Sequence, residues 1–245
     1  MDAIIICGEK DEDIVQRCVD GLAMHVVDLR YIFVIAEKKL HLSNCVVFEE
    51  GLFPFTRDVV QAKTSTAAEA GRYLRELIRF YAPLLISGCS DTVLVIDADT
   101  ILYKRVRFIE NNKYLFDMKR ELVQLNDMTL LNPNFLPYKP LTSGSVCHGV
   151  WAKEYLMEIM HKVETTLDVS FWEHYLDARL QKKEGGFDAY EVYWHYMMRN
   201  HADRVRIRVL RSSNYGQRWD LNTGDYQYIS YPFQIQRESP KRLRI

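Results

Sequence analysis

The stretch Val93–Leu102 reads VLVIDADTIL, an apolar run that leads into two carboxylates, Asp97 and Asp99. A short apolar run of this kind is typical of a buried β-strand. Side chains alternate along a strand, so two acids separated by one residue point to the same side where the strand ends. The stretch therefore predicts a strand of an α/β sheet whose carboxyl end presents two acids to one hard cation.

The acid pair suits the chemistry of a nucleotide diphosphate. A diphosphate leaving group develops negative charge as its bond to a sugar breaks, and a divalent ion neutralises that charge. Magnesium or manganese would take the two acids and two phosphoryl oxygens, with room left for a histidine or water. Two solvated acids in a surface turn are the alternative, but like charges at the end of a buried strand are costly without a cation between them.

Composition describes a chain that can bury a large core. Of the 245 residues, 48% are hydrophobic and 12% aromatic, which favours one α/β domain spanning residues 1–245. The 32 basic and 33 acidic side chains nearly cancel and are mixed along the length. We therefore expect no attraction to nucleic acid or to anionic lipid.

The cysteines and the hydropathy of the chain indicate the cellular compartment in which the protein is expected. The five cysteines are scattered and contain no C-x-x-C pair, so neither a disulfide framework nor a zinc site is predicted and a reducing compartment fits best. No stretch approaches the roughly 18 apolar residues of a membrane span. A cytoplasmic protein without a membrane span is the expectation.

Alternating strand and helix patterns predict a mostly parallel, Rossmann-like sheet flanked by helices. The apolar run 3–7, the helical spacing of 14–23 and the apolar runs 31–36 and 45–48 form a βαββ opening. Ligands of such sheets bind at the carboxyl ends of the strands. Cys7 and Gly8 end the first strand, so we expect them at the cofactor.

A capped helix leads into the strand of the acid pair. Thr66 and Glu69 form a capping box, and the apolar stripe that follows is expected to stop at Pro83. The proline-rich stretch 126–140 is predicted to be irregular and to form a substrate loop. Further on, the pattern predicts helices around 155–163, 171–176 and 188–200, and an edge strand over 205–209.

Three polar residues share one face of the helix expected over 188–200. Asp188, Glu191 and His195 are spaced i, i+3 and i+7, while aromatic residues occupy much of the remainder. A carboxylate there could act as a base or hold sugar hydroxyls, so Asp188 and Glu191 are catalytic candidates. For Asp188, an acid that complements the helix dipole is an equal alternative.

Other candidates are single residues. His148 lies between a cysteine and a glycine, where a neutral imidazole could complete the metal shell. Arg79, on the helix that leads to the acid pair, could reach a phosphate or ribose. Arg72 and Arg75 lie on the same helix, and at least one of these arginines is expected to be simply solvated. Trp172 could stack on a sugar ring, with core packing as the alternative.

Taken together, the chain resembles GT-A glycosyltransferases, and in particular a D-x-D transferase family of unknown function found in bacteria and large DNA viruses of the chlorovirus type. Three ordered blocks carry this resemblance: the segments 47–55, 71–82 and 94–102, then Ser143–Trp151 with its following helix, then Phe187–Tyr193.

The resemblance implies a hexosyl- or pentosyltransferase. A UDP-sugar donor would bind in the half 1–105, and a glycan or other hydroxyl acceptor in the half 106–245. Asp97 and Asp99 would hold Mn²⁺ or Mg²⁺ and the diphosphate, and Arg79 would face the nucleotide. His148 would lie beside the donor sugar or metal, with Glu191 or Asp188 near the reacting carbon.

Several positions depart from the pattern of that family. The helix block usually reads Gly-Trp-Tyr-x-Gln-Gln, whereas here Arg72, Arg75 and Glu76 replace the tryptophan and both glutamines. The third block usually has Ser-Glu where this chain has Asp188-Ala189. These changes affect the donor sugar and leave the metal acids intact.

Two other functional classes fit part of the sequence. In an aspartate phosphatase, Asp97 would attack phosphorus and Asp99 would act as acid. The motif starts nearly a hundred residues into the chain, however, and Ile101 replaces the usual threonine or valine. A degenerate, non-catalytic carbohydrate-binding module is the third possibility, and the retained acids argue against it.

Overall fold

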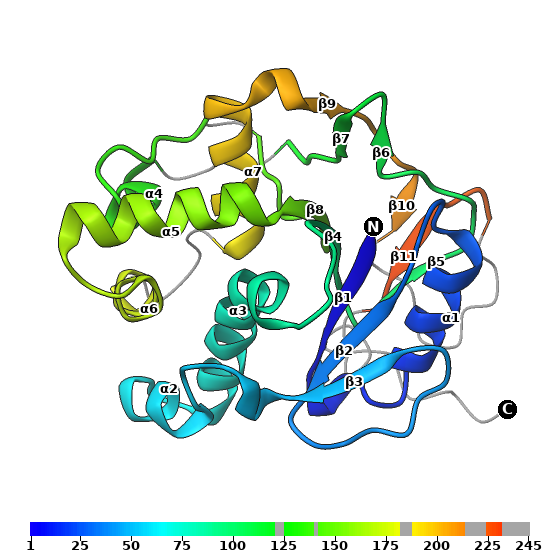
Figure 1. Ribbon diagram of the computed structural model, residues 1–245, viewed down its shortest axis with the longest axis horizontal. Helices are drawn as coiled ribbons and strands as arrows, with labels where there is room; N and C mark the ends of the chain where they lie inside the picture. The colour runs from blue at the N-terminus through cyan, green and yellow to red at the C-terminus, as the bar shows by residue number, and fades with distance from the viewer. Residues whose placement is uncertain (121–124, 140–141, 182–187, 214–223, 232–245) are drawn as a thin grey trace, which may run out of the picture.

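A five-stranded sheet forms the centre of the computed structural model, which describes residues 1–120, 125–139, 142–181, 188–213 and 224–231. Its strand order is β3-β2-β1-β4-β8 (Figure 1). The first four strands run parallel and β8 runs antiparallel to β4. Their bounds are β1 Asp2–Cys7, β2 Ile32–Ala36, β3 Val46–Glu49, β4 Thr92–Asp97 and β8 His148–Ala152. The predicted mixed, mostly parallel α/β sheet is confirmed.

Two helices cover opposite faces of this sheet, α1 (Val15–His25) and α3 (Ala67–Leu85) (Figure 1). The connection from β1 to β2 leads toward the β3 edge of the sheet, and the connection from β3 to β4 leads in the opposite direction, past β2 and β1. Crossovers between parallel strands are right-handed, so reversing the direction moves the helix to the other face. The sheet is therefore covered on both sides, and its central strands β1 and β2 are buried throughout.

The remaining elements build the second half of the molecule and two small sheets. The α3 face also carries α5 (Lys153–Leu167), α6 (Phe171–Leu180) and α7 (Ala189–Asn200), with α4 (Leu125–Leu131) against α6 and α2 (Arg57–Lys63) against α3. The small sheets have the orders β10-β11-β5 and β6-β7-β9. Their strands are β5 Thr100–Leu102, β6 Ile109–Glu110, β7 Lys113–Phe116, β9 Val205–Ile207, β10 Ser212–Ser213 and β11 Tyr228–Ser230, and the short 3-10 helices are Glu9–Asp11, Glu50–Leu52 and Ala202–Arg204.

Several local predictions need correction. The helix α3 continues through Pro83 to Leu85, because a proline in the last turn removes only one backbone donor. The stretch 126–140 is not wholly irregular, since α4 occupies its first part. The helix α2 was missed, although Thr56 caps it by accepting a hydrogen bond from the Val59 amide.

A buried ion pair fastens α3 to α6. Glu76 accepts hydrogen bonds from Arg179, whose Nε lies 2.9 Å from Glu76 Oε2, and from the Tyr175 hydroxyl at 2.9 Å. Both charged side chains are at most 5% exposed. Glu76 is therefore part of the core.

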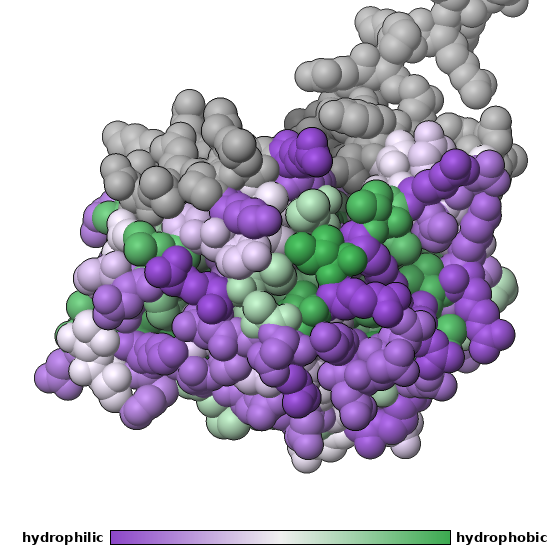
Figure 2. All heavy atoms as spheres, turned by 90° about the horizontal axis from the view of Figure 1, so that it is seen from above, coloured by the Kyte–Doolittle hydropathy of each residue, from purple (hydrophilic) through white to green (hydrophobic). Residues whose placement is uncertain are grey.

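The surface is mixed in character. Figure 2 shows a face that is mostly hydrophilic, with hydrophobic side chains gathered near its middle. In the part of the chain that the structure describes, no helix is both long and apolar enough to cross a membrane.

Candidate active site

Asp97 lies where β4 ends and receives two hydrogen bonds on one oxygen. Its Oδ1 lies 2.5 Å from Arg79 Nη2 and 3.0 Å from the Tyr190 hydroxyl. The Arg79 guanidinium stacks over the Tyr190 ring at 5.0 Å from the centroid. Helices α3 and α7 therefore converge on the first acid of the pair, and Arg79, predicted to reach a phosphate or ribose, binds Asp97 in this structure.

Asp99 follows in the turn between β4 and β5. Burial and the negative charges of Asp97 and Asp11 raise the pKa of Asp99 to about 7. The carboxyl ends of β1 and β4 lie side by side, since Ile6 pairs with Asp97 in the sheet. Asp97 and Asp99 therefore lie at the carboxyl edge of the sheet, with Asp11 near enough to act on Asp99.

His148 does not join the acid pair. It pairs with Ile96 in the β4–β8 ladder, so its side chain lies on the sheet face opposite to that of Asp97. Its Nδ1 lies 3.0 Å from the Val146 carbonyl oxygen and its Nε2 lies 2.9 Å from Asp117 Oδ2. Both ring nitrogens thus contact oxygen atoms of the protein, and neither is directed at Asp97 or Asp99.

Among the described residues, no group of three or more His, Cys, Asp or Glu side chains is placed to hold a metal ion. The two acids and His148, which the sequence suggested as one metal shell, are therefore not assembled as such. Periodicity along a single strand predicted the two acids. It could not predict on which face of a distant strand the histidine would lie.

Asp188 caps the first turn of α7. Its Oδ1 accepts a hydrogen bond from the Glu191 amide at 2.9 Å, and its Oδ2 accepts one from the Ser145 hydroxyl at 2.6 Å. Burial and the nearby charge of Glu76 raise the pKa of Asp188 to about 6. Asp188 thus lies at the helix N-terminus, as in the helix-dipole alternative, but as a partly buried N-cap with a raised pKa and not as an exposed acid.

Glu191 is buried and has partners on both oxygens. Oε1 accepts a hydrogen bond from the Ser143 hydroxyl, and Oε2 lies 3.2 Å from the Gly144 amide and 3.0 Å from His195 Nε2. The amide of Tyr138 donates to His195 Nδ1 at 3.0 Å. Glu191 and His195 do share one helix face as predicted. Glu191 holds the turn 143–145 against α7, and His195 binds the backbone at Tyr138.

Trp172 lies on α6 and packs with aromatic rings of the core. Its ring centroid is 6.0 Å from that of Phe55. This position matches the core-packing alternative for Trp172. The first strand, in contrast, ends as expected at the acid edge, with Cys7 buried and its thiol donating to the Gly8 carbonyl at 3.5 Å. Burial raises the pKa of Cys7 to about 12.

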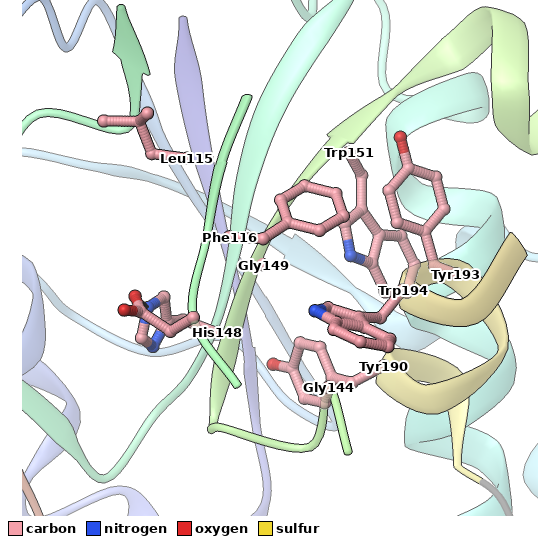
Figure 3. A pocket seen from close by; sticks show the side chains of 10 residues that line it. Leu115, Phe116, Gly144, His148, Gly149, Trp151, Tyr190, Tyr193 and Trp194 are labelled. Atoms are coloured by element: carbon pink, nitrogen blue, oxygen red, sulfur yellow. Dashed lines mark hydrogen bonds and ion pairs between the residues drawn. The ribbon is translucent and has the colours of Figure 1, made fainter. Parts of the chain in front are cut away.

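A small cavity lies between β7, β8 and α7. Figure 3 shows the rings of Trp151, Tyr190, Tyr193 and Trp194 at one side of it and His148 at the other. Its volume of about 20 Å³ suffices for about one water molecule and is far below that of a sugar site. The buried Trp194 Nε1 has no hydrogen-bond partner among the described atoms, and a water there would satisfy it.

Sequence reasoning missed Tyr190 as a polar partner. In the sequence, Tyr190 is one of several aromatic residues of its helix, and nothing in the sequence around it distinguishes it from the others. The packing of α7 against β8 decides which hydroxyl meets Asp97.

Comparisons with known proteins extend these observations at the level of the fold. No protein-family model matches the chain, and no curated protein sequence does. Among solved structures, the chain is similar to mouse xyloside xylosyltransferase 1 in its apo form, with a TM-score of 0.52 and 9% identity. The similarity covers 94% of this chain and 97% of the mouse chain. It confirms the GT-A-like fold, and the narrower resemblance to the bacterial and viral family stays a prediction.

Proposed function

We propose that this chain is a glycosyltransferase that moves a sugar from a nucleotide diphosphate donor to a hydroxyl acceptor. The observation that carries this proposal is the acid pair Asp97 and Asp99 at the carboxyl end of β4, within a fold shared with a protein named as a xylosyltransferase. Ligands of open α/β sheets bind at this edge. We take a UDP-linked hexose or pentose as the donor and a glycan as the acceptor.

The donor set fits a divalent metal. Within the described residues, Asp97 accepts its hydrogen bonds on Oδ1, which leaves Oδ2 for a cation. Asp99 lies among other acids that raise its pKa, and a cation would relieve that repulsion. Mn²⁺ or Mg²⁺ on these two residues would neutralise the leaving diphosphate, with the remaining ligands coming from the donor and water.

The chain's own residues would orient this site. Arg79 and Tyr190 hold Asp97 in one rotamer, so its free oxygen stays directed at the ligand. On the acceptor side we assign Asp188 as the carboxylate that meets the acceptor hydroxyl. Its pKa of about 6 leaves it ionised near pH 7 and still basic enough to take a proton. Asp188 is only partly buried, although both its oxygens also accept hydrogen bonds. Glu191 is buried and bonds to Ser143 and Gly144, so we take it as a positioning residue for the turn 143–145.

A thermal-shift screen tests the proposal. Nucleoside diphosphates and nucleotide sugars are added with and without manganese, since a ligand of the folded state raises its melting temperature. We expect one nucleotide to stabilise the protein only with metal, and slow hydrolysis of the matching nucleotide sugar. The variant Asp99→Ala should lose the metal-dependent shift while still folding. Asp91→Ala serves as the control, because the Asp91 side chain is fully exposed just before β4 begins.

Two results would contradict the transferase. If Asp99→Ala keeps the metal-dependent shift, the metal assignment is wrong. If no nucleotide stabilises the protein and a generic aryl phosphate is hydrolysed instead, the protein is an aspartate-nucleophile phosphatase and not a glycosyltransferase. In that reaction Asp97 would have to leave Arg79 and attack phosphorus, and Asp99, with a pKa near 7, would serve as the acid.

A further inference from the structure

Arg75 occupies a distinctive place at the acid edge of the sheet. It lies one helical turn before Arg79 on α3, so both guanidinium groups extend from the same helix face. Its Nη1 approaches Gly8, where an added Cβ would lie only 3.1 Å away. It also approaches Gly71, where the corresponding distance is 3.3 Å. Two glycines thus make room for this side chain beside the end of β1.

Among the described residues, Arg75 has neither a hydrogen bond nor an ion pair, although it is partly buried. Neighbouring arginines differ. Arg79 pairs with Asp97 at 2.5 Å, Arg57 pairs with Glu50 at 2.8 Å, and Arg179 is bound in the core. Burial and the like charge of Arg79 lower the pKa of Arg75. The charges of Asp11, Asp97 and Glu50 favour the charged guanidinium, but within the described residues none of these acids bonds to it directly.

A partly buried guanidinium whose N–H groups have no direct acceptor has a physical cost. Burying a charge is unfavourable unless it is paired, and a planar guanidinium is best paired by two oxygens of one oxyanion. A second cation lies close, since Arg57 Nη1 is 3.5 Å from the position of a Gly71 Cβ, while its Nη2 pairs with acids. Two arginines from α2 and α3 thus converge at the edge where β1 ends.

We propose that Arg75 binds a phosphoryl group of the donor nucleotide beside Gly8, through contacts that do not involve the metal. The identity of this anion as a donor phosphate rests on the proposed function. The oxyanion site itself rests on the unpaired guanidinium, the two glycines and the converging Arg57. The metal on the acids and the guanidinium of Arg75 would then hold the donor's diphosphate from two directions.

Calorimetric titration with inorganic pyrophosphate in the presence of a chelator tests the site without requiring any transferase activity. Wild-type protein should bind pyrophosphate without metal. Arg75→Gln should weaken that binding about tenfold or more, the range of one charge-assisted bidentate contact. Arg72→Gln is the matched control, because Arg72 lies on the same helix, is exposed and contacts Tyr73 instead.

A second readout separates binding from folding. Removing an unpaired, partly buried charge does not weaken the folded state, so Arg75→Gln should melt at or above the wild-type temperature without ligand. The same variant should lose most of the stabilisation given by pyrophosphate. A melting temperature well below that of wild type would mean that Arg75 has a structural partner, and would overturn the proposal.

The donor panel distinguishes this inference from the proposed function. Loss of affinity for UDP, with uridine unaffected, supports a phosphate contact. An effect confined to UDP-glucuronate, absent from UDP-glucose and pyrophosphate, would place a sugar carboxylate there and overturn the phosphate assignment. Equal pyrophosphate affinity in wild type and Arg75→Gln overturns it as well. If pyrophosphate binding depends on Arg75 while no nucleotide sugar is bound or cleaved, the oxyanion site at Arg75 is supported and the proposed glycosyltransferase function is rejected.

Discussion

At the residue scale, the hydroxyl of Tyr190 can be tested separately from its ring. Tyr190→Phe removes the 3.0 Å hydrogen bond to Asp97 but keeps the ring under Arg79. We expect a loss of about 0.5–1.5 kcal/mol in the free energy of unfolding, the usual net value of one such bond. Because Asp97 is then held by Arg79 alone, metal-dependent donor affinity should fall too. Urea unfolding and donor titration measure the two effects, and unchanged values in both would contradict the assigned role.

Asp188 gives a pH-dependent prediction at the same scale. Its pKa is raised to about 6 in the folded protein from an ordinary value of 3.8, so the folded state binds its proton more tightly than the unfolded chain. Stability from this residue is therefore present below about pH 4 and is lost as pH rises to about 6. Asp188→Asn keeps an N-cap residue and removes the charge.

The expected result for Asp188→Asn is a flatter stability profile between about pH 4 and 6 than that of wild type. Above that window the variant should gain on the order of 1–3 kcal/mol relative to wild type. Asp203, an exposed acid in a 3-10 helix, provides the control as Asp203→Asn. A wild-type slope that persists in Asp188→Asn would show that another group titrates there.

At the element scale, the ion pair between α3 and α6 makes a strong prediction. Glu76→Gln removes the charged partner that bonds to the buried Arg179, and breaking such a pair from one side costs about 3–5 kcal/mol. Replacing both residues by methionine should recover much of that loss, because no charge is then buried. Denaturant unfolding compares these variants with Glu110→Gln, whose exposed pair with Arg206 should contribute under about 1 kcal/mol.

The contact between the turn 143–145 and α7 is equally specific. A Cβ at Gly144 would lie 2.2 Å from Trp194 Cβ, which is impossible without movement. Gly144→Ala should therefore displace the turn, break the contacts of Ser143 and Gly144 with Glu191, and cost roughly 1–3 kcal/mol or more. Gly51→Ala meets no atom within 4 Å and should be nearly neutral in the same unfolding assay.

Helices and strands were predicted correctly where the residues of one segment show a clear hydrophobic pattern. The strand before Asp97 and the helices over 153–167 and 189–200 follow from apolar runs and helical spacing. The prediction failed at α4, whose proline-rich surroundings resemble a loop, and at Pro83, where the helix continues for two more residues. At α4, packing against α6 outweighs the local preference. At Pro83 the last turn loses only one backbone donor, so the helix continues.

At the scale of the whole molecule, a distant strand supports the acid pair. The strand β11 pairs with β5, and the Tyr231 amide donates to the Asp99 carbonyl at 2.9 Å. Ile229 is buried in a cluster with Ile14, Ile101 and Tyr231. Ile229→Ala should cost about 2–5 kcal/mol in unfolding free energy and weaken donor binding, whereas Val209→Ala, 83% exposed, should do neither. Intact donor binding in a destabilised Ile229→Ala would show that β11 does not support the site.

By itself the sequence determined the fold class, the order of its main elements and the edge of the sheet at which the acids lie. Apolar periodicity and turn residues act over short range, so these features are visible in consecutive residues. Only the tertiary structure decided that Arg79 and Tyr190 share Asp97, that His148 faces Asp117 on the other side of the sheet, and that Arg75 stands unpaired beside Gly8. Such contacts depend on which faces of distant elements meet, and spacing along one segment carries no information about the orientation of another.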